Sequence, residues 1–323
     1  MKNRKISVVV PVFNEEGSLE KLSNALKNGL EDCKRLGYSD YDIWFVSDGS
    51  TDGSEKLIRG LIEHDSRIKL IVFRKNFGKA AALQAGFTHS NGDVVVTMDS
   101  DLQDDPAEIK DMLALLDEGY DMISGWKRNR NDPLEKRLPS KLFNKVTSIM
   151  SGVKLHDFNC GFKAYKREVL DSIDVYGELH RYIPVLASRR GFNIGEMEVL
   201  NHKREHGKSK YGIERYLRGL FDSLTTTFLS RYYDRPMHFF GRVGLIFLFV
   251  GLLICLVLGV QWLMGESIGS RPLLILGILA IILGVQSIST GFIGDMLVDA
   301  TYRIRSNNGH IKTIVDNSET TSN

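Results

Sequence analysis

The residues with the clearest chemical potential are two aspartates and a glutamine at alternating positions, Asp99, Asp101 and Gln103. At the end of an extended strand, residues two positions apart point the same way, so the carboxylates can converge on one hard divalent ion. Mg²⁺ leaves part of its coordination shell to water and substrate phosphates, which suits a nucleotide diphosphate. The alternative is structural, because Asp is also an ordinary residue of turns and helix N-caps.

Polar residues gather in two further segments, 11–16 (PVFNEE) and 47–53 (SDGSTDG), each at the end of an apolar run. If these runs are parallel strands, the segments meet residues 99–106 at one edge of the sheet. Carboxylates crowded there repel each other unless a cation or a polar ligand joins them. A dinucleotide-binding or P-loop site is not expected, because the glycine-rich motifs of both are absent from the sequence. Without Cys and His at ligand spacing, zinc is not expected either.

Short apolar runs alternate with helical stretches in the first half of the chain. The runs cover residues 6–12, 42–48, 68–73, 93–99 and 120–124, and helices are expected at about 15–36, from 54, at 78–89 and at 107–117. Nearly continuous apolar strands joined by helices predict an α/β fold with a parallel sheet covered on both faces. Ligands of such a sheet bind at the carboxyl ends of its strands.

Two uncharged segments, 243–264 and 272–294, dominate the C-terminal part. Each is long enough to cross roughly 30 Å of hydrocarbon as a helix. Buried core helices are the alternative, but neither segment has the polar face that a helix of a small domain keeps. The short connection, 265–271, predicts a hairpin, and the Lys and Arg residues of its outer flanks predict that both chain termini are cytoplasmic.

The average composition hides this division. The chain has 323 residues, 43% of them hydrophobic, with 42 basic and 40 acidic residues and three cysteines. These values exclude a disordered chain, a collagen-like fibre and a disulfide scaffold, and the small net charge of +2 argues against a nucleic-acid partner. The first 238 residues hold 37 of the basic and 35 of the acidic residues, so they form a charged part that precedes an apolar one.

A series of segments resembles the family 2 glycosyltransferases of GT-A fold, especially dolichol-phosphate mannose synthases and bacterial polyprenyl-phosphate (bactoprenol) glycosyltransferases. The segments are VVVPVFNEE (8–16), SDGSTDGS (47–54), RKNFGKAAALQAG (74–86), MDSDLQDDP (98–106), DFNCGFKAY (157–165), ELHRYIP (178–184) and REHGKSKYG (204–212). The resemblance extends from about residue 6 to residue 305. Ser47 is a departure, because the family usually has Asp-Asp-Gly-Ser at this point. The Gln-x-x-Arg-Trp motif of the processive members is absent, which favours transfer of a single sugar.

The resemblance implies a GT-A, Rossmann-like and mostly parallel sheet followed by a two-helix transmembrane hairpin. It implies inverting, metal-dependent transfer of one sugar from a nucleotide sugar to undecaprenyl or another polyprenyl phosphate at the cytoplasmic membrane face. UDP-glucose or UDP-N-acetylglucosamine is the expected donor, by analogy alone. The alternatives are a glycosyltransferase with a glycan or protein acceptor, and a non-catalytic scaffold that binds nucleotide sugars at the membrane.

Site residues also follow from the resemblance. The nucleotide sugar is expected to contact Pro11, Phe13, Glu15, Asp48, Asp99 and Ser100. Mg²⁺ or Mn²⁺ is expected on Asp99, Asp101 and Gln103, and Asp101 and Asp157 are the expected catalytic residues. Asp157 would orient the acceptor or act as a base, and the alternative is that it caps the turn before Cys160.

Cationic residues near the family segments are expected to hold the acceptor phosphate or the diphosphate. The candidates are Lys127, Arg137, Arg204 and Lys210. A solvated face or attraction to lipid headgroups is the alternative for most basic residues of this part.

The predicted organisation has four parts. They are a cytoplasmic catalytic domain (1–212), an amphipathic juxtamembrane segment (213–238), two transmembrane helices (239–302; about 241–264 and 272–296) and a cytoplasmic tail (303–323). Glycines in the first apolar segment could support a homo-oligomer.

Overall fold

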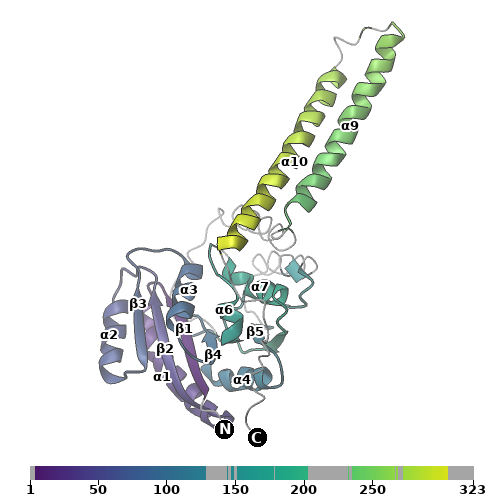
Figure 1. Ribbon diagram of the computed structural model, residues 1–323. Helices are drawn as coiled ribbons and strands as arrows, with labels where there is room; N and C mark the ends of the chain where they lie inside the picture. Colours follow the sequence, from purple (N-terminus) through teal and green to yellow (C-terminus); the bar gives the residue numbers. More distant parts are fainter. Residues whose placement is uncertain are drawn as a thin grey trace. The chain divides into compact units, whose positions relative to one another are not determined.

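The computed structural model describes residues 4–128, 151–177, 179–202, 235–265 and 272–304, and the single positions 144, 147, 148, 232 and 267. The chain divides into two compact units, Met1–Thr226 with Gly309–Asn323 and Thr227–Asn308. The first unit contains the sheet and the second contains two long helices (Figure 1).

The first unit is built on a seven-stranded sheet with the strand order β3-β2-β1-β4-β6-β5-β7 among the described residues. The strands are β1 (Arg4–Val12), β2 (Tyr38–Ser47), β3 (Ile68–Val72), β4 (Val94–Thr97), β5 (Met122–Trp126), β6 (Lys163–Lys166) and β7 (Ile194–Glu198). Strands β1 to β4 pair in parallel, as the sequence predicts. Strand β6 is antiparallel to both β4 and β5, which makes the sheet mixed. The expectation of a mostly parallel sheet is therefore confirmed, and β6 and β7 are the strands that the sequence pattern did not reveal.

Helices cover both faces of this sheet (Figure 1). They are α1 (Glu16–Asp32), α2 (Ser54–His64), α3 (Lys79–His89), α4 (Ile109–Asp117), α6 (Arg167–Asp171) and α7 (Ile183–Arg189), with the short 3₁₀ segments η1 (Cys33–Leu36), η2 (Pro106–Glu108) and η3 (Leu179–Arg181). The alternation of side chains along a strand explains the two cores, because successive residues of β1 point to opposite faces. Val8 and Val10 pack with α1, α2 and α4, whereas Val9 packs with α3 and α7.

The packing of α3 against β1 is close enough to require a glycine. A Cβ atom at Gly86 would lie 2.2 Å from Cγ1 of Val9. Helix α3 therefore packs very closely against the sheet. Its first residue, Lys79, lies near the carboxyl end of β4.

The second unit is a pair of helices, α9 (Met237–Leu263) and α10 (Pro272–Ile304). Met237–Leu263 and Pro272–Val298 have mean hydropathies of 3.1 and 2.3, and both are long and apolar enough to cross a membrane. Many of their large apolar side chains are exposed, for example Phe249 at 70% and Ile275 at 71%. Such a surface suits lipid rather than water.

Small residues hold the two helices together. A Cβ atom at Gly244 would lie 2.7 Å from the carbonyl oxygen of Gly284, and one at Gly251 would lie 2.8 Å from that of Gly277. These glycines therefore allow close backbone approach within one chain, which is the usual role of small residues between membrane helices. The homo-oligomer that glycines of α9 could support stays a prediction.

Candidate functional site

Three neighbouring strands bring the polar segments together. Strands β2, β1 and β4 are adjacent and parallel, so the segments at their carboxyl ends share one edge of the sheet. Hydrogen bonds tie these segments to each other. The amide of Thr51 donates to Oδ1 of Asn14 at 2.7 Å, and the hydroxyl of Ser18 donates to the carbonyl oxygen of Ser100 at 2.6 Å. The expected meeting of the three segments is confirmed.

Residues expected to bind the nucleotide sugar lie along this edge. Pro11 and Glu15 are partly exposed, Phe13 is exposed and Ser100 is buried. Asp48 is buried, and its two carboxylate oxygens accept hydrogen bonds from the amides of Phe77 and Gly78 at 2.7 and 2.9 Å. The carboxylate thus anchors the loop that follows β3. Its contact with a nucleotide stays a prediction.

Asp99 follows β4 and forms an ion pair with Lys79, the first residue of α3. Burial raises the pKa of this carboxyl, but the positive charges of Lys79 and Lys127 outweigh that effect and lower the pKa to about 2. The carboxylate also lies directly against Gly161, where a Cβ atom would be 2.5 Å from both carboxylate oxygens. Only glycine leaves this space for the side chain of Asp99.

Asp101 is in a different electrostatic state. Burial and the charge of Asp99 raise the pKa of Asp101 to about 6. Its Oδ1 accepts a hydrogen bond from the amide of Gln103 at 3.2 Å, across a turn in which Leu102 has a φ of 60°. A non-glycine residue in the left-handed region is uncommon, so this turn is held by its surroundings. Asp101 therefore lies close to another negative charge, and no cation among the described residues forms an ion pair with it.

Lys127 forms a buried ion pair, and its positive charge also acts on these two aspartates. Its Nζ lies 2.5 Å from Oδ1 of Asp104, and the two side chains are 9% and 0% exposed. Burial opposes the charged form of Lys127, but the negative charge of Asp104 raises the pKa of the ammonium group. The ammonium group of Lys127 is thus paired with Asp104, in the loop that follows β4. A contact of Lys127 with the acceptor phosphate stays a prediction.

Asp157 lies in a turn that other residues hold in place. Its Oδ1 accepts a hydrogen bond from the amide of Asn159 at 3.1 Å. The amides of His156 and Asp157 donate to Oε1 of Glu196 on β7 at 2.8 and 3.1 Å, and the ring of His156 stacks on Trp126 with centroids 4.1 Å apart. This geometry favours the capping role that the sequence left open. A catalytic role of Asp157 stays a prediction.

Three of the cations expected at the acceptor phosphate, Arg137, Arg204 and Lys210, lie outside the described residues. The same holds for most of the predicted juxtamembrane segment, 213–238, and for the tail from residue 305 onward. The predicted domain boundaries therefore stay predictions.

The carboxyl ends of β2, β1 and β4, with the aspartates that follow β4, form an acidic edge of the sheet. A divalent metal fits this acidic edge if the substrate completes the coordination of the metal. Asp99 and Asp101 supply carboxylate oxygens, which are the ligands that Mg²⁺ and Mn²⁺ prefer. The described part of the chain contains no group of three or more His, Cys, Asp or Glu side chains that could hold a metal by themselves. A metal on this edge would therefore need Gln103, water or substrate oxygens as further ligands.

Sequence reasoning did not single out several residues that shape this edge. Lys79 and Gly161 contact Asp99, and Asp104 pairs with Lys127. All three residues lie in segments that the resemblance had identified. Those segments were the available signal. The missing information was the partner of each residue, because Lys79 and Asp99 are 20 positions apart and Gly161 is 62 positions from Asp99.

Comparison with known proteins identifies relatives over nearly the whole chain. The model of the family described as glycosyl transferase family 2 matches residues 7–174. A dodecaprenyl-phosphate galacturonate synthase of Rhizobium johnstonii is 37% identical over 94% of this chain and 90% of its own length. An undecaprenyl-phosphate 4-deoxy-4-formamido-L-arabinose transferase of Proteus mirabilis is 32% identical over 92% of this chain and 89% of its own length.

Solved structures share the fold. The glucosyl-3-phosphoglycerate synthase of Mycobacterium tuberculosis, crystallised with Mn²⁺, uridine diphosphate and phosphoglyceric acid, has a TM-score of 0.51 and 21% sequence identity. The match covers 71% of this chain and 78% of that chain. At this identity the likeness concerns the fold alone, and it confirms the GT-A, Rossmann-like architecture.

Proposed function

Because this chain belongs to glycosyl transferase family 2, we propose that it transfers one sugar from a nucleotide-sugar donor to a polyprenyl phosphate in the membrane. That it is a glycosyltransferase follows from the family itself. The observation that carries the acceptor is the combination, in one chain, of the acidic sheet edge and two helices apolar enough to cross a membrane. Both relatives named for a polyprenyl phosphate align over at least 92% of this chain, so their similarity includes the helices.

On the donor side, the acidic edge suits a nucleoside diphosphate. Asp99, Asp101 and Gln103 would hold Mg²⁺ or Mn²⁺, which would neutralise the negative charge that develops on the diphosphate as the anomeric C–O bond breaks. The chain's own contribution is to keep the two carboxylates in place. Lys79 and Gly161 fix Asp99, and the turn at Leu102 fixes Asp101.

On the acceptor side, a lipid phosphate is already anionic near neutral pH. It therefore needs less help from a general base than a sugar hydroxyl does, and its position relative to the anomeric carbon matters more. A direct displacement at that carbon would invert its configuration. Arg137, Arg204 and Lys210 are the proposed phosphate contacts, and Asp157 is the proposed orienting residue.

For the donor sugar, we extend the expectation from glucose and N-acetylglucosamine to acidic and modified sugars. Neither relative is named for a neutral hexose, since one is named for galacturonate and the other for 4-deoxy-4-formamido-L-arabinose. A galacturonate donor is our first choice, because it belongs to the relative with 37% identity.

We also propose that the protein is a multi-pass membrane protein with its first unit and both termini in the cytoplasm. Basic residues support this orientation, because Arg235 lies just before α9, Arg242 lies near the start of α9 and Arg303 lies at the end of α10. The nucleotide sugar would then reach the acidic edge from the cytoplasm.

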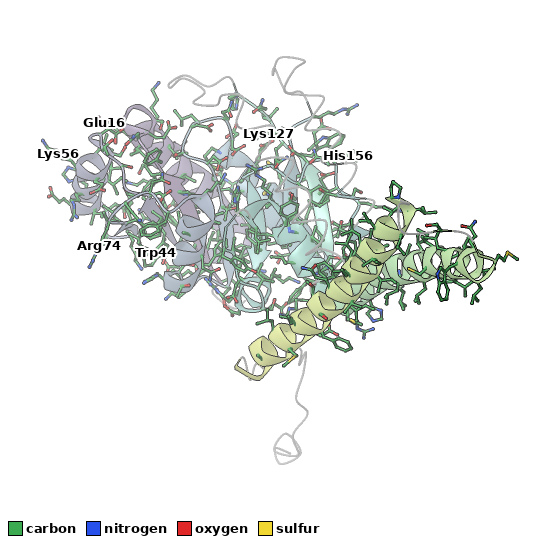
Figure 2. The ribbon with its side chains drawn as sticks, turned by 90° about the horizontal axis from the view of Figure 1, so that it is seen from above. Glu16, Trp44, Lys56, Arg74, Lys127 and His156 are labelled. Atoms are coloured by element: carbon green, nitrogen blue, oxygen red, sulfur yellow. The ribbon has the colours of Figure 1, made fainter. Side chains whose placement is uncertain are left out.

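The test uses the full chain in detergent or nanodiscs with undecaprenyl phosphate, labelled nucleotide sugars and Mg²⁺ or Mn²⁺. The donor panel contains UDP-glucose, UDP-N-acetylglucosamine, UDP-galacturonate and a nucleotide-linked 4-formamido-arabinose. We expect a labelled sugar-lipid that forms only when the lipid phosphate is present. The matched control is the variant Lys56→Gln, whose exposed side chain on α2 lies far from Lys127 in Figure 2. Transfer that ignores added lipid phosphate would instead indicate a glycan or protein acceptor, and absence of product from every donor would overturn the proposal.

A further inference from the structure

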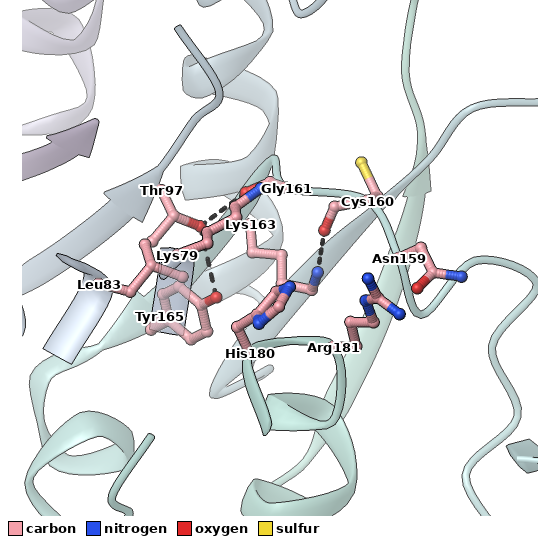
Figure 3. A pocket seen from close by; sticks show the side chains of 10 residues that line it. All are labelled: Lys79, Leu83, Thr97, Asn159, Cys160, Gly161, Lys163, Tyr165, His180 and Arg181. Carbon is pink, nitrogen blue, oxygen red and sulfur yellow. Dashed lines mark hydrogen bonds between the residues drawn. The ribbon is translucent and has the colours of Figure 1, made fainter. Parts of the chain in front are cut away.

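The turn that ends at Gly161, just before β6, is held by side chains of two strands (Figure 3). The hydroxyl group of Thr97, the last residue of β4, donates to the carbonyl oxygen of Gly161 at 2.8 Å. The amino group of Lys163, the first residue of β6, donates to the carbonyl oxygens of Phe158, at 3.3 Å, and Cys160. Two side chains therefore bind three carbonyl groups of one short turn.

This turn lies directly against the carboxylate of Asp99. A Cβ atom at Gly161 would be 2.5 Å from both oxygens of that carboxylate, so the backbone of the turn limits where the side chain of Asp99 can lie. Lys79 contacts the same carboxylate. The side chain of Asp99 is nevertheless 32% exposed, which leaves part of it open to a ligand. The turn thus forms one wall of the place where Asp99 would bind a metal.

Lys163 and Thr97 reach the same turn because they lie opposite each other in the sheet. Strands β4 and β6 are antiparallel, and Thr97 is the partner of Lys163 in their register. Residues directly opposite in an antiparallel pair point to the same face of the sheet. Both residues are buried, at 2% and 3% exposure. Burying an amine costs free energy that burying an apolar side chain does not, so the need to fill a core does not explain Lys163.

The hydrogen bonds of Lys163 do not require its positive charge. Burial lowers the pKa of this amino group, because the charged form is disfavoured away from water. The charged form of a lysine has three N–H groups and the neutral form has two. The two carbonyl oxygens of the turn need only two donors, so both forms of Lys163 can hold them. The turn is therefore held by hydrogen bonds rather than by an excess of charge.

We propose that Lys163 and Thr97 are positioning residues of the metal site: they fix the turn that keeps the Asp99 carboxylate in place, and thereby set the affinity for Mg²⁺ or Mn²⁺. The proposal rests on the proposed function, since it concerns the metal of the same site. Asp99 supplies the ligand atoms, and the other two residues act through the turn. Without their hydrogen bonds the turn can move away from Asp99, and its carboxylate then has more than one position to adopt.

The experiment measures binding of Mn²⁺ to the full chain in nanodiscs, with UDP present, from the electron paramagnetic resonance signal of free Mn²⁺. The result does not depend on turnover. Lys163→Met keeps the length of the side chain and removes its N–H groups, and we expect it to weaken Mn²⁺ binding about tenfold. Thr97→Val should weaken it about threefold, because one hydrogen bond between neutral groups is lost. Thr97→Ser keeps the hydroxyl group and should restore the affinity of the wild type.

Lys166→Met is the matched control, because it makes the same substitution on the same strand. Lys166 pairs with Asp121 at 2.8 Å and lies three residues after Lys163, on the opposite face of β6, so Mn²⁺ binding should not change. Thermal unfolding of each variant checks the fold, and the two Thr97 variants decide the matter if Lys163→Met does not fold. Unchanged Mn²⁺ affinity in folded Lys163→Met or in Thr97→Val would overturn the proposal, as would a wild type that binds no Mn²⁺. Lipid-dependent sugar transfer by the wild type would then show that the proposed function stands without it.

Discussion

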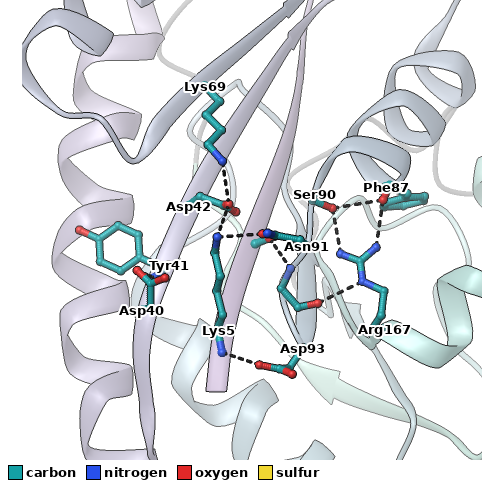
Figure 4. A network of polar contacts seen from close by, with 12 residues as sticks. Lys5, Asp40, Tyr41, Asp42, Lys69, Phe87, Ser90, Asn91, Asp93 and Arg167 are labelled. Atoms are coloured by element: carbon teal, nitrogen blue, oxygen red, sulfur yellow. Dashed lines mark hydrogen bonds and ion pairs between the residues drawn. The ribbon is translucent and has the colours of Figure 1, made fainter. Parts of the chain in front are cut away.

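At the amino ends of the strands, opposite charges are paired, whereas at the carboxyl ends three aspartates crowd together between positions 99 and 104. Lys5 lies 2.8 Å from Asp42, which Lys69 also contacts at 3.3 Å (Figure 4). The guanidinium group of Arg167 donates to the carbonyl oxygens of Phe87 and Gly92 at 2.9 and 3.0 Å. In each of these contacts, both partners are groups of the protein itself.

At the carboxyl ends of the strands, not every acidic group is paired with a cation of the protein among the described residues. Lys79 pairs with Asp99 and Lys127 pairs with Asp104, which leaves Asp101 next to a like charge. This difference in charge pairing favours the carboxyl ends of the strands, rather than the amino ends, as the place where a ligand binds. A fold that buries like charges together loses stability, and it recovers that loss when a cation or a substrate binds.

The largest expected effect comes from removing one charge at the carboxyl edge. Asp101→Asn should reduce transfer about 10³-fold, equivalent to ~4 kcal/mol, because the proposed metal would lose a carboxylate ligand. The melting temperature without metal should stay the same or rise, since the substitution removes repulsion between Asp99 and Asp101. Initial rates with Mg²⁺ and Mn²⁺ and a thermal melt measure both quantities. Full activity in this variant would contradict the metal role.

The buried pair of Lys127 and Asp104 should affect stability more than any ion pair at the amino ends. Lys127→Met leaves Asp104 buried without its cation, so we expect the free energy of unfolding to fall by about 3 kcal/mol. The double variant Lys127→Met with Asp104→Asn should recover much of that loss, because neither charge remains. Denaturant titrations of the single and double variants measure the coupling.

The outcome of this cycle also bears on the acceptor. If Lys127→Met unfolds no more easily than wild type but binds lipid phosphate less tightly, Lys127 is an acceptor contact, as the sequence predicted, and the pairing with Asp104 is secondary. Asp104→Asn alone serves as the matched control, because it keeps the lysine and removes its partner.

Gly161 tests how closely the carboxyl edge is packed. A Cβ atom added by Gly161→Ala would lie 2.5 Å from the carboxylate oxygens of Asp99, so that side chain must move. The end of an aspartate side chain moves at little cost, and we expect stability to fall by about 1 kcal/mol. Activity should fall about tenfold, because the carboxylate leaves its position.

Gly60→Ala is the matched control for Gly161→Ala. Gly60 lies in α2, and a Cβ atom there would meet nothing within 4 Å. Replacing a helical glycine by alanine should stabilise the fold by roughly 0.5–1 kcal/mol and leave activity unchanged. If both alanine variants lost activity equally, the close contact at Asp99 would not be the cause.

The sequence predicted elements better than contacts, for physical reasons. The alternation of Val8, Val9 and Val10 and the helical periodicity are local, so strands β1 to β5 and helices α1 to α4 could be placed from residue order alone, whereas β6, β7, α6 and α7 were not predicted. The two apolar helices followed from length and the absence of charge. The meeting of the three polar segments followed from a general property of parallel sheets.

Contacts over long separations could not be predicted in this way. Strand β6 inserts between β4 and β5 in the antiparallel direction, and no local pattern specifies its neighbour. The same applies to Lys127, which the sequence assigned to a phosphate and the structure pairs with Asp104. Residues that line one small pocket, such as Lys79, Thr97 and His180, come from separate segments that only the tertiary fold brings together.

The smallest effect is expected at the amino ends of the strands. Lys5→Met removes one of two cations beside Asp42, and Lys69 remains 3.3 Å away, so we expect a loss of about 1 kcal/mol in stability. Lys5→Arg keeps the charge and should recover most of it, and both variants should transfer sugar within about twofold of wild type. Denaturant titration and initial rates measure these quantities. A large loss of activity without a loss of stability would show that the two edges are coupled, and the division between a structural edge and a ligand-binding edge would then be wrong.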